Sequence, residues 1–302
     1  CLILAAMAAG CRAVQCREFS VDLAVDVIPA QSVSVLALTE PLFRKMFDHP
    51  SASRDAFRSL RAVFSAGATL EPVVQRAEDE FGFRLTNVYG SSEILALAAF
   101  WGAAENVAER AQAGGILTST GMRVRAADDA GNVLPPGGVG ELQFTGPIVT
   151  AGYLGNGDAT RAAFTDDGWF RSGDLGRVLD EDGSSFHYLA RMGDAMRLKG
   201  FLVHPGEIED MLQQHPGVST AQVVGIPEGT GEEVPVAFVI LGPGARATPD
   251  MLREFCRARM ASYKVPAAIE IVDAFPTTRS PNGDKVVKAR LREMAKELIA
   301  HG

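Results

Sequence analysis

The chain has 302 residues, with 29 basic and 37 acidic side chains and a formal net charge of −8 at pH 7. Hydrophobic residues make up 47% of the sequence and charged residues 22%, which is a globular composition and excludes a disordered or low-complexity protein. The acidic balance argues against a nucleic-acid-binding or anionic-membrane-binding protein, although a local basic site could still hold phosphates.

The chain begins at Cys1 and enters an apolar run over residues 2–9. No basic segment precedes this run, as a secretory signal requires, and a spanning helix needs roughly 20 apolar residues. We therefore expect a buried helix of an N-terminally truncated domain. No later stretch is long enough to cross a bilayer, and the cysteines and histidines show no disulfide framework or metal-ligand spacing, so a cytoplasmic protein is expected.

Short β-rich runs alternate with helical patterns over roughly the first 180 residues, as in parallel α/β layers. Apolar spacing predicts a helix over residues 40–47 and another whose face carries Val73, Ala77 and Phe81. Turn sequences favour an antiparallel, β-rich section over residues 121–190. Strands are predicted over residues 32–38, 60–64, 85–88, 122–126, 140–144 and 186–189.

From Arg191 the pattern is that of a small α+β domain, and we place a boundary at about residue 190. Pro205 stands in the first turn of a predicted helix, because proline is tolerated there. Two strands, over residues 218–226 and 234–241, and helices around residues 252–256 and 291–298 follow. The predicted domains are therefore residues 1–190 and 191–302.

Three short segments carry side chains suited to nucleotide chemistry. Tyr89-Gly90-Ser91-Ser92-Glu93 follows a strand, where open α/β sheets bind ligands, and offers an aromatic face, a close backbone approach, two hydroxyls and a carboxylate. Gly173-Asp174 would fix a carboxylate in a tight turn that could accept ribose hydroxyls. Asn282-Gly283-Asp284-Lys285 presents a lysine that could offset charge on a phosphate. Taken singly, each is explained as well by an ordinary turn or a solvated basic helix start.

The order of these segments, with several others, resembles the adenylate-forming superfamily of acyl-CoA synthetases, peptide-synthetase adenylation domains and luciferases. The resemblance runs from about residue 20 to residue 298. Its blocks, in order, are Ser65-Ala66-Gly67-Ala68, Asn87 to Glu93, Gly140-Glu141-Leu142, Gly152-Tyr153, Gly173-Asp174, Arg191, Lys199-Gly200-Phe201, Pro205 to Glu209, Tyr263 to Pro266, and Lys285 to Lys288 with Leu291-Arg292.

The resemblance implies roles for individual residues around the nucleotide. Tyr89 would stack on adenine, Ser92 would contact the α-phosphate or the carboxylate, and Glu93 would bind Mg²⁺. Asp174 would hold the ribose hydroxyls, and Arg191 would contact ribose or phosphate. Gly67, Ala68, Gly90 and Ser91 would also lie beside the nucleotide.

Further roles are implied for the C-terminal part of the chain. Lys285 would be the catalytic lysine of adenylation, and Lys199, Gly200 and Phe201 would line the tunnel for the thiol of coenzyme A. Gly193 and Asp194 would form the hinge.

The sequence departs from the family pattern in four places. Ser92 replaces the usual threonine, Gly193 replaces the usual Asp or Lys of the hinge, and Asp284 separates Gly283 from Lys285. The family's Gly- and Ser/Thr-rich phosphate loop, ending in Lys-Gly, does not occur in these residues. In relatives it lies upstream, so we expect the chain to be the later part of a longer enzyme.

The expected fold class is α/β: the C-terminal part of a large multi-layered N-terminal domain, containing an α/β and a β-rich section, followed by a small α+β lid domain. The expected activity is that of an ATP-dependent carboxylic acid–CoA ligase that acts on a fatty or other acyl substrate, with ATP, CoA, Mg²⁺ and a small carboxylic acid as ligands. Two alternatives stay open: an adenylation domain that loads a carrier protein, and a catalytically incomplete fragment that lacks the phosphate loop. The oligomeric state is left open.

Overall fold

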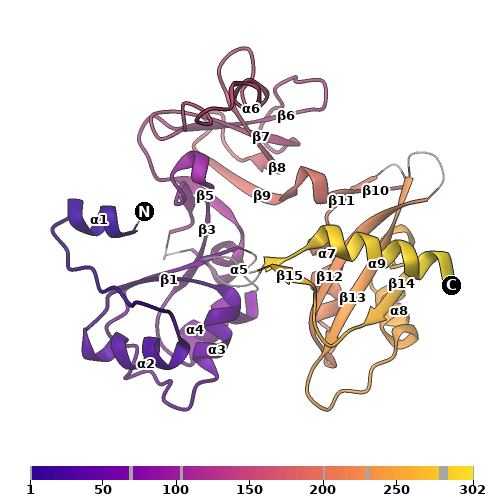
Figure 1. Ribbon diagram of the computed structural model, residues 1–302, viewed down its shortest axis with the longest axis horizontal. Coiled ribbons are helices and arrows are strands. Elements are labelled where there is room, and N and C mark those ends of the chain that lie inside the picture. The colour runs from indigo at the N-terminus through magenta and orange to yellow at the C-terminus, as the bar shows by residue number, and fades with distance from the viewer. Residues whose placement is uncertain are drawn as a thin grey trace. The chain divides into compact units, whose positions relative to one another are not determined.

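A computed structural model describes residues 2–67, 71–102, 105–199, 201–228, 232–278 and 285–301. It divides into two compact units, Cys1–Leu189 and Ala190–Gly302, each with its own sheet and core (Figure 1). No helix in the described ranges is long and apolar enough to cross a membrane.

The first unit opens with helices and parallel strands in alternation, as the sequence predicts. The strands β1 (Val35–Thr39), β2 (Ala62–Ala66) and β3 (Leu85–Tyr89) pair in parallel. The helices α2 (Val21–Ala30), α3 (Glu40–Phe47) and α4 (Glu71–Asp79) gather beside them (Figure 1).

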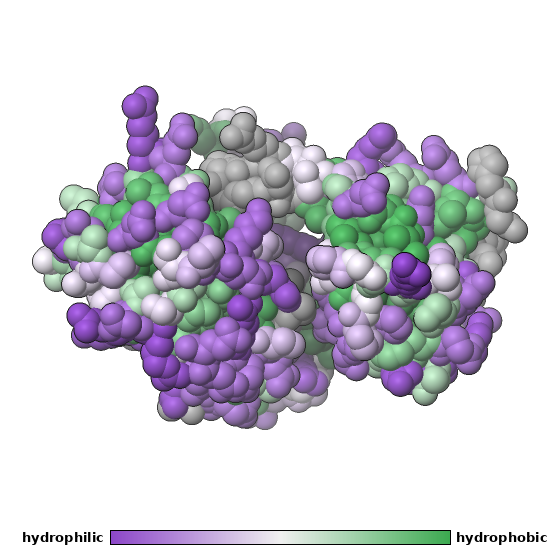
Figure 2. Space-filling view, turned by 90° about the horizontal axis from the view of Figure 1, so that it is seen from below, coloured by the Kyte–Doolittle hydropathy of each residue, from purple (hydrophilic) through white to green (hydrophobic). Residues whose placement is uncertain are grey.

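The core of this layer forms where the apolar faces of these helices meet the strands. It is rich in phenylalanine: Phe43, Phe47, Phe57, Phe81 and Phe83 are at most 5% exposed, and their rings pack against one another. Each such ring stabilises the fold by roughly 1.5–3 kcal/mol relative to an exposed one. Hydrophilic residues dominate the face of this unit drawn in Figure 2, as expected for helices whose apolar residues point inward.

The rest of the first unit is largely antiparallel, which confirms the β-rich section. It contains β4 (Ala99–Phe100), α5 (Val107–Ala111), β5 (Gly114–Leu117), β6 (Arg123–Ala127), β7 (Val139–Thr145), α6 (Gly157–Ala162), β8 (Phe170–Val178) and β9 (Ser185–Arg191). One sheet continues through all of these strands in the order β1-β2-β3-β4-β5-β9-β8-β7-β6. The strands β3 and β7 are not neighbours in this order, yet Tyr89 on β3 packs against Phe144 on β7, so the sheet curls back on itself.

The second unit is a small α+β structure. Its chain order is η2 (Met192–Asp194), β10 (Met196–Leu198), β11 (Phe201–Val203), α7 (Pro205–Gln213), β12 (Val218–Glu228), β13 (Glu232–Leu241), α8 (Pro249–Arg257), η3 (Ser262–Lys264), β14 (Ala268–Ile271), β15 (Thr277–Thr278), β16 (Lys285–Val286) and α9 (Lys288–His301). The strands β12, β13 and β14 form the central sheet. Leu291 and Ala295 of α9 are buried against this sheet in a cluster with Val224 and Phe238.

The expectation for the start of the chain is only half right. Residues 2–8 do form a helix, α1 (Leu2–Ala8), because leucine, alanine and methionine are strong helix formers. The helix is not buried, however: Leu4 is 68% and Met7 69% exposed. Within the described residues, too little of the chain packs on α1 to cover its apolar side chains.

Candidate active site

The first part of the candidate site lies where the parallel strands end. Ala66 at the end of β2 pairs with Val88 of β3, so Gly67 and Gly90 follow neighbouring strands at one edge of the sheet. Carboxyl ends of parallel strands are where α/β sheets bind ligands. Gly67 has a φ of 92°, which favours glycine. The predicted nucleotide-contacting residue Ala68 lies outside the described residues.

A closed turn follows β3 and requires glycine at position 90. A Cβ atom on Gly90 would lie 2.1 Å from the carbonyl oxygen of Ala96, closer than any real contact. The turn is held by bonds from the Ala96 N–H to the Ser91 carbonyl (2.7 Å) and from the Ala98 N–H to the Tyr89 carbonyl (3.0 Å).

Two residues of this turn adopt a conformation that non-glycine residues avoid. Leu95 has a φ of 61° and Ala96 one of 66°. Each such residue costs on the order of 1–2 kcal/mol, and strain of this kind clusters at functional sites. The turn places the side chain of Ser92 at the surface, at the start of the short helix η1 (Ser92–Ile94).

Tyr89 and Asp174 meet inside the first unit. The Tyr89 hydroxyl donates a 2.5 Å hydrogen bond to Oδ2 of Asp174, and the two residues are 7% and 3% exposed. The Tyr89 ring also packs against Phe144, Phe186 and Tyr188, with ring centroids 5.0–5.7 Å apart. The structure thus brings together the aromatic residue predicted for adenine and the carboxylate predicted for ribose.

The local structure of Asp174 differs from the predicted tight turn. Gly173 and Asp174 lie within β8, where the pairing with β7 shifts register between Glu141 and Gln143. The Ser172 hydroxyl donates to the Leu142 carbonyl (2.6 Å) and accepts from the Asp174 N–H (3.0 Å), while Gly173 takes a φ of 67°. The carboxylate is therefore positioned by a strand irregularity, which is a common way to aim a side chain at a site.

Glu93, the predicted magnesium ligand, has a partner that the sequence did not identify. The Tyr153 hydroxyl donates to Oε1 of Glu93 (3.0 Å), and the Glu93 carbonyl accepts from the Thr150 N–H (2.7 Å). Partial burial raises the pKa of Tyr153, and the nearby Glu93 carboxylate adds to the rise. The block Gly152-Tyr153 was the available signal, but spacing alone could not assign the tyrosine a role.

The remaining candidate residues belong to the second unit. Arg191 ends β9 with its side chain exposed, and Gly193 and Asp194 form the short helix η2. Leu198 of β10 pairs with Phe201 of β11, and Lys199, which follows Leu198, has a φ of 50°. Gly200 itself lies outside the described residues.

Phe201, the third residue predicted for the coenzyme A tunnel, belongs to an aromatic pair. The Phe201 ring, 57% exposed, stacks on Tyr263 with centroids 4.8 Å apart. The neighbouring Lys264 is ion-paired to Glu207, which raises the pKa of that lysine. The backbone of Lys285 in β16 pairs with that of Thr278 in β15. The side chain of this predicted catalytic lysine lies outside the described part of the chain.

Comparisons with known proteins agree on one family. The family model "AMP-binding enzyme" matches residues 1–154, and the model "AMP-binding enzyme C-terminal domain" matches residues 207–282. A fatty acid–[acyl-carrier-protein] ligase, ScoC, of Streptomyces coeruleorubidus is 33% identical over 292 residues, which are 94% of this chain and 54% of the relative. A feruloyl-CoA synthase of an Amycolatopsis species is 32% identical over 274 residues, covering 91% of this chain and 54% of the relative.

A solved structure has the same fold. ATP-bound MatB from Rhodopseudomonas palustris superposes with a TM-score of 0.83 at 27% identity, over 94% of this chain and 55% of that one. The chain thus spans about half the length of the curated relatives that it matches.

Proposed function

The chain belongs to the AMP-binding enzyme family, and from this premise we propose that the full-length protein is an ATP-dependent ligase that joins a carboxylic acid to the thiol of coenzyme A. The observation that carries the proposal is the Tyr89–Asp174 contact beside the glycine turn, because it unites residues suited to adenine and ribose at a ligand-binding edge.

The proposed reaction has two steps. An oxygen of the carboxylate attacks the α-phosphorus of ATP, and the bond to pyrophosphate breaks, which gives an acyl-adenylate. The thiol of coenzyme A, losing its proton, then attacks the acyl carbon, and AMP leaves as the thioester forms.

We assign the nucleotide to the residues of the first unit. Asp174 accepts the ribose hydroxyls, Tyr89 supports the adenine, and Gly67 and Gly90 let the backbone approach the nucleotide closely. Ser92 presents its hydroxyl to the α-phosphate or the carboxylate. Ser91 and Ala68 contribute their backbone to the same surface.

A magnesium ion fits the donor set around Glu93. No group of three or more potential ligands occurs among the described residues. Mg²⁺ is usually held by one or two carboxylates together with substrate phosphates, so a single glutamate is sufficient. When bound, the ion would offset the negative charge of the phosphates.

The second unit, Ala190–Gly302, would complete the site. Lys285 would stabilise the charge that develops during adenylation, and Lys199, Gly200 and Phe201 would border the path of the coenzyme A thiol. Arg191 would contact ribose or phosphate. Gly193 and Asp194 would provide the hinge for exchange between the two steps, a gating motion of the lid type.

The test is carboxylate-dependent exchange of labelled pyrophosphate into ATP by the full-length gene product. Fatty and aryl acids should support exchange, and absence of exchange with every acid would refute the ligase. Lys285→Ala should abolish exchange but spare thioester formation from a supplied acyl-adenylate. Lys296→Ala, an exposed lysine on α9, is the matched control and should retain both reactions.

A second acceptor is favoured by one comparison, because ScoC is named as an acyl-carrier-protein ligase. The alternative function is therefore transfer of the acyl group to the phosphopantetheine thiol of a carrier protein. Product analysis with coenzyme A and with a loaded carrier protein, each as the sole acceptor, distinguishes the two.

A further inference from the structure

The first turns of α9 place two cations over the predicted hinge. Nη2 of Arg292 donates to the Gly193 carbonyl (2.8 Å) and to Oδ1 of Asp194 (2.6 Å). Nζ of Lys288 lies 3.8 Å from the other oxygen of the same carboxylate. Lys288 and Arg292 can act together because residues four apart lie on one face of a helix.

The same lysine connects the hinge to the body of the second unit. Nζ of Lys288 lies 3.6 Å from Oε1 of Glu209 on α7, and that oxygen also accepts the N–H of Val223 on β12 (2.9 Å). We call Asp194, Glu209, Lys288 and Arg292 the hinge anchor. Their side chains are between 15% and 33% exposed, so solvent screens their ion pairs only in part.

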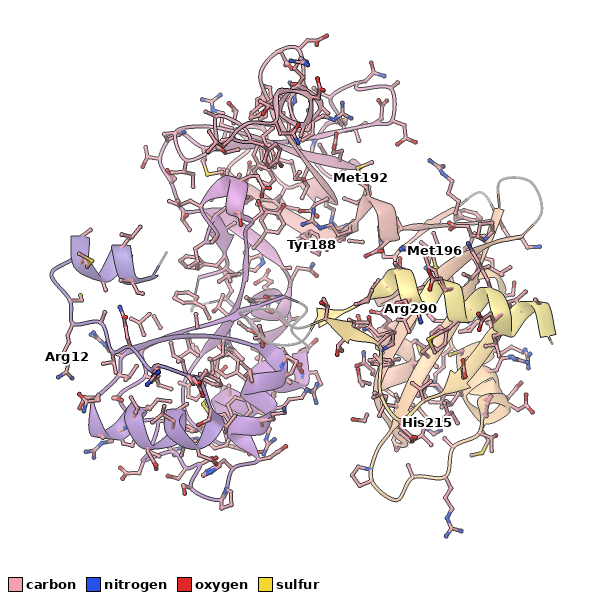
Figure 3. The ribbon with its side chains drawn as sticks, in the orientation of Figure 1. Arg12, Tyr188, Met192, Met196, His215 and Arg290 are labelled. Atoms are coloured by element: carbon pink, nitrogen blue, oxygen red, sulfur yellow. The ribbon has the colours of Figure 1, made fainter. Side chains whose placement is uncertain are left out.

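The hinge turn is a short element of low intrinsic stability. It is a three-residue 3₁₀-helix, and the N–H of Ala195 after it donates to the Arg191 carbonyl (3.2 Å). Gly193 in its middle has nothing within 4 Å of the position of a Cβ atom. Short 3₁₀ turns and glycines are both easy to deform. Figure 3 labels Met192, which opens this turn, and Arg290 on α9.

We propose that Arg292 is a positioning residue that fixes the 192–194 turn to α9, so that the turn moves with the second unit and rotation occurs in the backbone before Gly193. The proposal rests on the proposed function, since that function requires the second unit to change orientation between adenylation and thioester formation. A side chain that binds both a backbone carbonyl and the adjacent carboxylate restricts two consecutive residues at once. Hinge motion would then be confined to few dihedral angles, as in other hinged enzymes.

The direct test is amide hydrogen exchange of residues 193–195, together with tryptic cleavage after Arg191, in the full-length gene product. Arg292→Ala should speed both by about tenfold, because it removes two charge-assisted hydrogen bonds. Arg292→Lys should give an intermediate rate, since one ammonium group cannot reproduce the guanidinium geometry. Arg290→Ala removes an exposed pair with Glu293 on the same helix and should change neither rate.

Two results would overturn the anchor. One is unchanged exchange at residues 193–195 in Arg292→Ala. The other is a uniform rise across the whole second unit, which would mean a merely structural role. Amide exchange and tryptic cleavage need no substrate. They therefore test whether Arg292 holds the 192–194 turn even if the wild-type protein forms no acyl-adenylate and the proposed function fails.

If the wild-type protein is active, the two half-reactions give a second readout. Under the proposed function Lys285 draws the second unit toward the nucleotide during adenylation, whereas the thioester step has no such contact. Arg292→Ala should therefore slow thioester formation from supplied acyl-adenylate about tenfold while changing pyrophosphate exchange less than about twofold. An equal loss in both would contradict a positioning role.

Discussion

The hydroxyl of Tyr89 donates a 2.5 Å hydrogen bond to the buried carboxylate of Asp174, across a sequence separation of 85 residues. The bond joins the last residue of β3 to the irregular part of β8, inside a cluster of aromatic rings. The geometry of one predicted nucleotide-binding segment therefore depends on the other.

Tyr89→Phe should reveal this dependence. The variant keeps the packed ring but removes the donor to a buried carboxylate, which should cost about 1–3 kcal/mol of unfolding free energy. Urea denaturation measures the loss. In an Asp174→Ala background the same tyrosine substitution should cost much less, and additive effects in this double-mutant cycle would show that the bond contributes nothing.

Gly90→Ala should disrupt the turn that precedes η1. The added Cβ would meet the Ala96 carbonyl oxygen at 2.1 Å, so the backbone must shift. We expect a loss of about 1–3 kcal/mol in stability, as for other overpacked sites, and weaker binding of AMP in calorimetry. Gly206→Ala on α7 is the matched control, because nothing lies within 4 Å of its Cβ position and alanine favours a helix. Comparable losses in the two variants would contradict the steric explanation.

Elements specified by nearby residues were predictable. The helix over residues 40–47 is confirmed as α3, because proline in its first turn and the spacing of Phe43, Met46 and Phe47 are local signals. The resemblance also selected Tyr89 and Asp174, which the structure brings into contact. Their binding roles stay predictions.

Features that depend on distant residues could not be predicted. The sequence predicted a turn at Gly173-Asp174, but these residues lie in an irregular part of β8. A hydrogen bond from the Ser172 hydroxyl to the carbonyl of Leu142, 30 residues away, holds this irregularity. Tyr153 had no role in the sequence because its partner Glu93 is 60 residues distant. Burial of α1 was wrongly expected, since periodicity reports an apolar segment but not what packs on it.

Arg110 should be a strong contributor to the stability of the first unit. Its side chain is 2% exposed, donates to the Leu85 carbonyl (3.1 Å) and forms an ion pair with Glu78. Arg110→Met should cost about 2–4 kcal/mol in urea unfolding, because it removes a buried cation that pairs with Glu78 and donates to the Leu85 carbonyl, while Arg84 (3.4 Å) still pairs with that carboxylate. Arg58→Ala, which removes a fully exposed pair with Asp55, should change stability by less than about 0.5 kcal/mol. Similar values for both would show that burial is unimportant here.

The thiols should differ sharply in reactivity. Cys256 is fully buried on α8, and burial raises its pKa to about 11, whereas Cys11 and Cys16 are exposed. Because the thiolate is the reactive form, Cys256 should resist iodoacetamide at pH 8 until urea unfolds the second unit. Peptide mass spectrometry quantifies each site, and Cys11 provides the internal control. Labelling of Cys256 at the rate of Cys11 in the native protein would refute the buried position.

His204 should make the stability of the second unit depend on pH near neutrality. Burial lowers its pKa below 6.5, Glu207 opposes the shift, and Lys264 adds to it. Between the lowered folded pKa and 6.5 the unfolded chain binds more protons than the folded one, so stability rises with pH in that window. The contribution is complete above pH 6.5 and is lost as the pH falls through the window.

The unfolding free energy of wild type should therefore decline more steeply than that of His204→Gln between pH 7.5 and about 5. Burial also lowers the pKa of His187 in the first unit. His187→Gln should therefore weaken the pH dependence of the unfolding free energy of that unit only. Parallel pH profiles for wild type and His204→Gln would contradict the assignment.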